Sequence, residues 1–145
     1  MHRPLAAAVF AALALPVLAL PAVADGYGFM TPSANIYCNG SLEGGPGGTS
    51  EITCFLVETS GPPPVPKPAG CAGVWGQAFA LAARGPAEMV CLDRPPQRAN
   101  FTDIAPYGVS AEFGDITCRS ETSGLTCRNA SGNGFTLARR QQQLF

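Results

Sequence analysis

The sequence ITCRSETSGLTC, residues 116–127, is the stretch that decides the fold. Residues 116–118 and 125–127 each carry an aliphatic residue two positions before a cysteine, and a polar stretch with a turn-forming glycine separates them. Because residues two apart point to the same face of a strand, each segment places an aliphatic group and a sulfur together. The stretch therefore predicts a β-hairpin in which Cys118 and Cys127 face each other.

The same pattern occurs earlier in the chain, at residues 36–38 and 52–54. These segments flank the glycine-rich residues 42–50, which we expect to form a long mobile loop. The two halves thus resemble each other. Any disulfide-clipped hairpin would show this pattern, so we interpret the likeness as shared local chemistry rather than as an internal duplication.

The N-terminal residues have the order of a secretory signal peptide. Arg3 precedes an apolar run over residues 5–20, and Pro21-Ala22-Val23-Ala24 supplies small residues for cleavage before Asp25. A transmembrane anchor, the alternative, needs about 20 apolar residues, and this run is shorter and contains a proline. No cysteine follows the cleavage site to carry a lipid. We therefore expect a signal peptide over 1–24 and a secreted or periplasmic single domain over 25–145.

The six cysteines form an even set that lies entirely beyond the predicted signal peptide. Even numbers of cysteines in short exported chains indicate a disulfide framework. CxxC pairs and histidines at ligand spacing are missing, so we expect no metal site. The two hairpins predict that Cys38 pairs with Cys54 and Cys118 with Cys127, and elimination then leaves Cys71 with Cys91.

These features predict a mainly β fold, a small antiparallel barrel or sandwich stapled by three disulfides. The proline-rich residues 61–68 cannot donate enough hydrogen bonds for a central strand, and we expect a surface crossover there rather than a partner-docking site or an interdomain linker. Residues 74–83 stay ambiguous between strand and short helix.

The net charge of −1 gives no electrostatic footprint for nucleic-acid binding. No later run of residues is apolar enough for membrane insertion after signal cleavage.

Two longer motifs suggest a family. Residues 29–38 read FMTPSANIYC, and residues 127–139 read CRNASGNGFTLAR. They resemble the F-x-T-P-S-x-N-I-x-C opening and C-x-N-x-x-G-x-G-F-x-L-x-R closing motifs of a family of secreted bacterial domains of unknown function, although Asn133 stands where that family leads us to expect histidine. The resemblance covers nearly the whole chain after the signal peptide. It implies an exported domain with paired cysteines and brings no catalytic residue, ligand or partner with it.

Most familiar hydrolytic chemistry is excluded by composition. The single histidine, His2, would leave with the signal peptide, so no Ser-His-Asp triad or histidine base can form. Six paired cysteines would leave no free thiol as nucleophile. A carboxylate pair of the glycosidase type remains open, but the acidic residues are scattered beside Gly, Ser and Thr as in solvated turns. We expect no catalytic residue, no cofactor and no enzyme activity.

The remaining function class is a binding or interaction module for an unknown extracytoplasmic protein or glycan. Candidate binding residues are Trp75, Tyr107 and Arg139, because aromatic and arginine side chains dominate binding hot spots. Trp75 also suits a core anchor, and Arg139 a surface ion pair. One alternative is an inhibitor of an extracytoplasmic hydrolase, which a protruding ordered loop would favour. The other is a carboxylate-pair hydrolase, which a deep cleft with facing carboxylates would favour.

Overall fold

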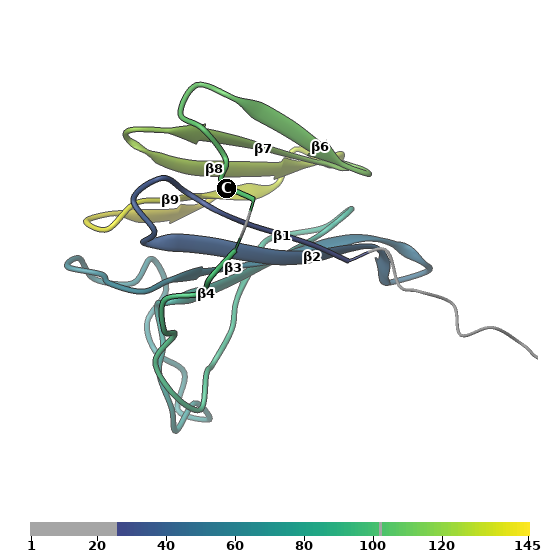
Figure 1. The fold of residues 1–145 in the computed structure, drawn as a ribbon. Helices are drawn as coiled ribbons and strands as arrows, with labels where there is room; N and C mark the ends of the chain where they lie inside the picture. Colours follow the sequence, from purple (N-terminus) through teal and green to yellow (C-terminus); the bar gives the residue numbers. More distant parts are fainter. Residues whose placement is uncertain (1–25, 102) are drawn as a thin grey trace, which may run out of the picture.

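The computed structural model describes residues 26–101 and 103–145. Within these ranges the chain is all β, without a helix, and no segment forms a helix capable of crossing a membrane. Two antiparallel sheets pack as the layers of a sandwich (Figure 1). The predicted mainly β class and antiparallel arrangement are confirmed. The predicted signal peptide over 1–24 and its cleavage site before Asp25 lie outside the described residues.

Each sheet is a meander of five strands that follow one another in the sheet as they do in the sequence. The first sheet contains β1 (Gly26–Met30), β2 (Ile36–Gly45), β3 (Thr49–Leu56), β4 (Ala78–Ala82) and β5 (Glu88–Met89). The second contains β6 (Ser110–Phe113), β7 (Ile116–Glu121), β8 (Gly124–Asn129), β9 (Gly134–Leu137) and β10 (Gln142–Leu144). Because neighbouring strands of each sheet follow one another in sequence, the chain passes between the sheets once, from β5 to β6.

The hairpin predicted from residues 116–127 is formed by β7 and β8. Buried and exposed residues alternate along β7, as the two-residue period requires. Cys118 lies directly opposite Cys127 in the register. Thr122 and Ser123 make the turn, and Gly124 leaves it with a φ of 145°, a value that favours glycine.

The glycine-rich residues 42–50 do not form the long mobile loop that we expected. β2 continues to Gly45 and β3 begins at Thr49, so the turn between them is short. The ladder is irregular between Ser41 and Gly45, and a side chain at Gly45 would meet the Thr49 carbonyl oxygen 2.9 Å away. Glycine here permits a bulged strand with close backbone approach, a role that composition alone does not distinguish from that of a loop.

The three predicted disulfides are all present: Cys38–Cys54, Cys71–Cys91 and Cys118–Cys127. The first and last join directly opposite residues in the two hairpins, where all four sulfurs are buried. The pair formed by Cys71 and Cys91 lies outside the strands and links the two connections that flank β4 and β5.

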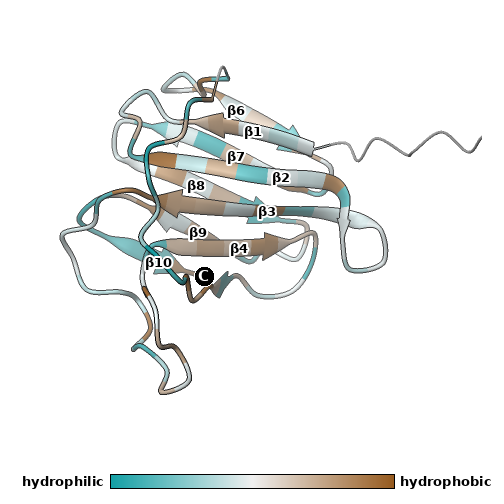
Figure 2. Ribbon diagram, turned by 60° about the horizontal axis from the view of Figure 1, so that its bottom comes forward, coloured by the Kyte–Doolittle hydropathy of each residue, from teal (hydrophilic) through white to brown (hydrophobic). Residues whose placement is uncertain are grey.

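Of the ambiguous residues 74–83, Ala78–Ala82 form strand β4 and none is helical. Phe79 and Leu81 of β4 are fully buried on its inner face, and Figure 2 shows β4 beside β3 as part of the apolar layer. The proline-rich residues 61–68 lie in the β3–β4 connection, form no strand and are largely exposed, as expected of a surface crossover.

The likeness between the two halves extends beyond their hairpins. One row of paired residues crosses all five strands of each sheet, with the disulfide at the second and third strands. In the first sheet this row is Phe29, Cys38, Cys54, Phe79 and Met89. In the second it is Ala111, Cys118, Cys127, Phe135 and Leu144. The rings of Phe79 and Phe135 lie 6.1 Å apart between their centroids and join the layers. Our restriction of the likeness to local hairpin chemistry was therefore too narrow.

Candidate functional site

Residues 103–109 carry the chain from the first sheet to the second. Two backbone hydrogen bonds tie this segment to Met30 of β1, and two more tie it to Ser120 of β7, all between 2.7 and 3.0 Å. We call it the crossing segment. Both ends of the segment are thus fixed to strands, and residues of the segment line two recesses.

The first recess is polar and encloses about 200 Å³. We call it the motif pocket, because residues of the opening and closing motifs line it together. Its walls come from four separate parts of the chain: Thr31, Ser33, Asn35, Ile36, Tyr107, Glu121, Thr122, Ser123, Gly124, Ala138 and Arg139. Two of the three predicted binding residues, Tyr107 and Arg139, thus line the same recess.

Arg139 is held in place by an ion pair. Its guanidinium lies 2.8 Å from a carboxylate oxygen of Glu58, and about half of each side chain stays exposed. Glu58 is positioned in turn by Asn35, whose amide accepts from the Glu58 backbone N–H at 2.9 Å and donates to the Glu58 carbonyl at 3.1 Å. The ion-pair interpretation of Arg139 is therefore correct, yet the pairing leaves the guanidinium at the pocket wall, where it can meet a ligand as well.

Tyr107 sits at the tip of the crossing segment. The backbone N–H of Val109 donates to the Pro106 carbonyl at 3.3 Å, and Gly108 has a φ of 85°. These features form a turn at Pro106-Tyr107-Gly108, a sequence of turn-forming residues. Tyr107 is 42% exposed at this turn and lines the motif pocket.

Trp75 lies apart from the other two candidates, in the β3–β4 connection. Its indole N–H donates to the Val65 carbonyl at 2.8 Å, and the side chain is half-buried rather than in the core. Trp75 therefore supports the proline-rich connection, and it lines neither recess beside the crossing segment.

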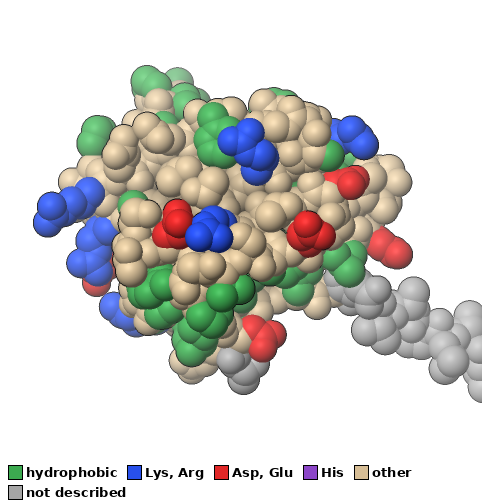
Figure 3. All heavy atoms as spheres, turned by 90° about the horizontal axis from the view of Figure 1, so that it is seen from above, with side chains coloured by type: hydrophobic (Ala, Val, Ile, Leu, Met, Phe, Trp, Pro, Cys, Tyr) green, Lys and Arg blue, Asp and Glu red, His purple; other side chains and the backbone are tan. Residues whose placement is uncertain are grey.

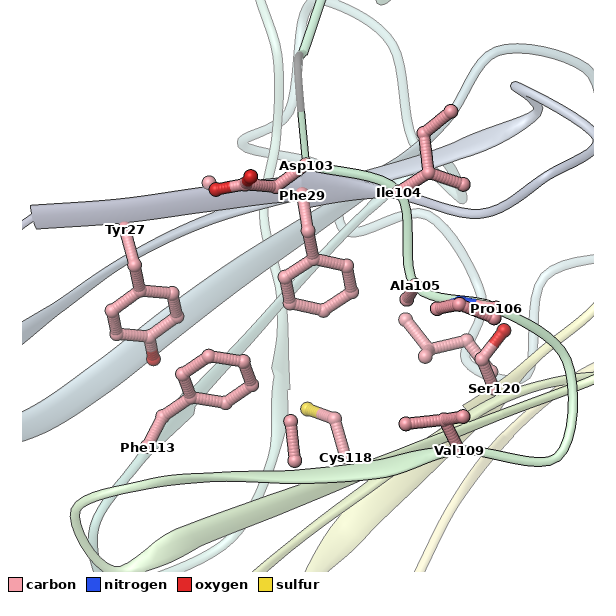
Figure 4. A pocket seen from close by; sticks show the side chains of 13 residues that line it. Tyr27, Phe29, Asp103, Ile104, Ala105, Pro106, Val109, Phe113, Cys118 and Ser120 are labelled. Carbon is pink, nitrogen blue, oxygen red and sulfur yellow. The ribbon is translucent and has the colours of Figure 1, made fainter.

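The second recess is apolar, and sequence reasoning missed it. It encloses about 240 Å³ between the edge strands β1 and β6 on the other side of the crossing segment (Figure 4). We call it the apolar pocket; the residues that line it are Tyr27, Gly28, Phe29, Asp103, Ile104, Ala105, Pro106, Val109, Ala111, Phe113, Cys118, Ser120 and Leu125.

Aromatic rings form one wall of the apolar pocket. The ring of Phe113 stacks on Tyr27 at 4.1 Å and on Phe29 at 5.5 Å between centroids. The Tyr27 hydroxyl donates to the Glu51 carbonyl at 3.1 Å. Burial, with a smaller contribution from the negative charge of Glu51, raises the pKa of Tyr27 well above its ordinary value.

A third recess carries two carboxylates, Glu51 and Glu88, together with Arg84. Both carboxylates are exposed on the outer side of the first sheet, and the register places them on strands separated by β4. A glycosidase needs one carboxyl in an apolar setting and both flanking a substrate cleft, which this exposed placement does not supply. In the described part of the chain no three acidic, cysteine or histidine side chains gather as a metal site would require.

A family model matches residues 7–145, which include every described residue of both sheets. The chain belongs to a family of unknown function, DUF6636. No curated protein and no solved structure matches this DUF6636 chain. Its three disulfides are consistent with a compartment outside the cytoplasm.

Proposed function

We propose that this DUF6636 chain is a non-enzymatic module that binds a protein outside the cytoplasm, and that it does so through the crossing segment and the motif pocket beside it. The observation that carries the proposal is the exposure of three large hydrophobic side chains within six consecutive residues. Ile104, Tyr107 and Val109 are 50%, 42% and 48% exposed.

The chemistry of this surface is that of a protein interface. Exposed apolar groups that gather on one ridge mark interaction sites, whereas single exposed residues need no explanation. Tyr107 and Arg139 are of the residue types that dominate binding hot spots. Figure 3 shows hydrophobic side chains at the rim of the molecule, while the sheet face viewed from above carries scattered charges of both signs.

Export is part of the proposal and rests on two features. The charged, apolar and small-residue order of residues 1–24 is typical of a signal peptide. Three disulfides in a small domain suit an oxidising compartment. A partner would then be met in the periplasm or outside the cell.

Capture of a partner from the periplasm or medium of the native host tests the proposal. Tyr107→Ala and Arg139→Ala should each weaken capture at least tenfold, since loss of a hot-spot side chain costs about 2 kcal/mol or more. Val65→Ala and Arg84→Ala are matched controls, because both sites are exposed and lie away from the motif pocket. The proposal fails if the controls weaken capture as much as the test variants. Retention of oligosaccharide with no protein captured would instead indicate a glycan ligand.

A specific observation also favours inhibition of an extracytoplasmic hydrolase. The β3–β4 connection projects from the sandwich (Figures 1 and 2). It is stapled by Cys71–Cys91 and braced by a 2.6 Å hydrogen bond from Lys67 to the Gly73 carbonyl. Val65 on this connection is 42% exposed. If this function holds, the protein should inhibit a secreted host hydrolase and Val65→Asp should abolish inhibition while leaving Tyr107-dependent capture intact.

A further inference from the structure

The apolar pocket exists because the second sheet lacks two rings that the first sheet has. On β1, Tyr27 and Phe29 face inward at the sheet edge. The equivalent places beside β7 belong to Val109, which is paired by a backbone hydrogen bond with Ser120, and to Ala111. The smaller side chains leave the space between the two edges unfilled.

The space has the size and walls of a small-molecule site. Its volume of about 240 Å³ exceeds that of an engineered apolar cavity of about 150 Å³ that binds benzene. The three stacked rings of Tyr27, Phe29 and Phe113 point into it from the two edge strands, as Figure 4 shows. A flat apolar body of about two fused rings would contact these walls.

A single buried polar group lies in the same pocket without a partner. Ser120 is 1% exposed, and its backbone N–H and carbonyl are both bonded to the crossing segment. Its hydroxyl has no hydrogen-bond partner among the described residues. Burial of an unpaired hydroxyl is unfavourable, so a ligand that offers a hydrogen bond here gains from a group that is already desolvated.

The charges around the pocket restrict the ligand further. Asp103 is the one charged residue among those that line it, and no lysine or arginine does. An anionic ligand would therefore meet no counter-charge and would be repelled at the entrance. The pocket suits a molecule without charge.

We propose that the apolar pocket binds a neutral, mainly apolar molecule of about the size of naphthalene, with one polar group that hydrogen-bonds the Ser120 hydroxyl. This site borders the proposed protein-binding surface, because Ile104 and Val109 of the crossing segment also line it. Ser120 is buried, however, and Tyr107 and Arg139 line the motif pocket and not this one. Variants of Ser120 and of Tyr107 or Arg139 therefore test the two proposals separately.

The hydrogen bond is tested by titrating the full exported chain with 2-naphthol and, separately, with naphthalene. Binding is monitored through the amide chemical shifts of the protein. 2-Naphthol should shift the amides of Val109, Ala111 and Phe113 most. Ser120→Ala should lower the affinity for 2-naphthol about fivefold and change the affinity for naphthalene less than twofold. One hydrogen bond contributes about a factor of five to ten to a binding constant. Equal effects on both probes, or shifts elsewhere only, would overturn the proposal.

Filling the pocket tests its location. Ala111→Phe places on β6 the ring that Phe29 supplies on β1, and it should lower the affinity for 2-naphthol at least tenfold. If the phenylalanine variant does not fold, the smaller change Ala111→Leu should also lower this affinity. Ala72→Phe is the matched control on the exposed β3–β4 connection and should change nothing. Unaltered binding in a folded Ala111 variant would place the probe elsewhere.

The charge and the independence of the site are tested with the same samples. 2-Naphthoate should bind at least tenfold more weakly than 2-naphthol, because its carboxylate lacks a cation; equal affinity would contradict the neutral-ligand assignment. Ser120→Ala should leave protein capture through Tyr107 unchanged. Loss of capture in that variant would contradict the separation of the two sites.

Discussion

At the scale of single residues, two buried asparagines hold chain segments that lie just beyond the ends of strands. Asn35 binds both backbone groups of Glu58. Asn129, at the end of β8, donates to the carbonyls of Ala82 and Gly85 at 3.0 and 2.8 Å, which links the second sheet to the first. Its side-chain oxygen accepts from two backbone N–H groups at 3.0 and 3.1 Å. The two motif asparagines are therefore structural clamps.

Replacement of Asn129 should destabilise the fold strongly. Asn129→Ala removes four hydrogen bonds from a buried site, and we expect the free energy of unfolding to fall by about 3 kcal/mol. Urea unfolding of the oxidised protein measures this loss. The neighbouring Asn133→Ala should cost less than about 1 kcal/mol. Similar losses in the two variants would show that the clamp does not act as described.

The buried Tyr27 hydroxyl should make the free energy of unfolding decrease at alkaline pH. Burial raises the pKa of Tyr27 above the unfolded value near 10.0, and burial also raises the pKa of Tyr37. The unfolded chain then loses these protons first, so stability is complete below pH 10 and falls as the pH rises further. Tyr27→Phe, which keeps the ring stack, should flatten this fall in urea midpoints measured at pH 9 and above. An unchanged slope would contradict the burial of the hydroxyl.

At the scale of elements, two disulfides stabilise the core and the third stabilises the surface connections. Cys38–Cys54 and Cys118–Cys127 sit at the centres of the two sheets, opposite Phe79 and Phe135 on the next strands. Cys71–Cys91 instead ties down connections outside the strands. Removal of the outer disulfide should therefore affect local opening more than the sandwich.

The paired replacement of Cys71 and Cys91 by serine tests this division. Chymotrypsin should cleave after Trp75 at least tenfold faster than in the parent protein, because the β3–β4 connection opens locally once unstapled. The near-ultraviolet spectrum of the buried core aromatics should change little. Loss of that spectrum would show that the outer disulfide supports the whole fold instead.

Prediction from sequence succeeded where the signal was local. The two-residue period of the aliphatic and cysteine positions sets which face of a strand is buried, and it predicted both hairpins and their disulfides. The same reasoning failed for residues 42–50, because glycine serves bulged strands and loops alike. Long strand β2 is recognised only from its register with β3.

At the scale of the whole molecule, both recesses depend on how distant segments meet. Tyr107 and Arg139 line one pocket because the crossing segment and the chain after β9 both reach the end of the second sheet where β7 turns into β8, a proximity that no short pattern encodes. The apolar pocket depends on Val109 and Ala111 lying opposite Tyr27 and Phe29 across the sandwich. A strand-by-strand comparison of the two halves is the sequence signal that would have located it.

Photo-crosslinking in the native host tests the proposed binding surface most directly. p-Benzoylphenylalanine is placed at Thr122 in the motif pocket, at Val65 on the β3–β4 connection, and at Thr117 on the outer face of β7; all three positions are exposed. The account predicts one discrete protein adduct from position 122, reduced by Tyr107→Ala, and none from position 117. Adducts from position 65 alone, or equal adducts from positions 117 and 122, would contradict binding through the motif pocket.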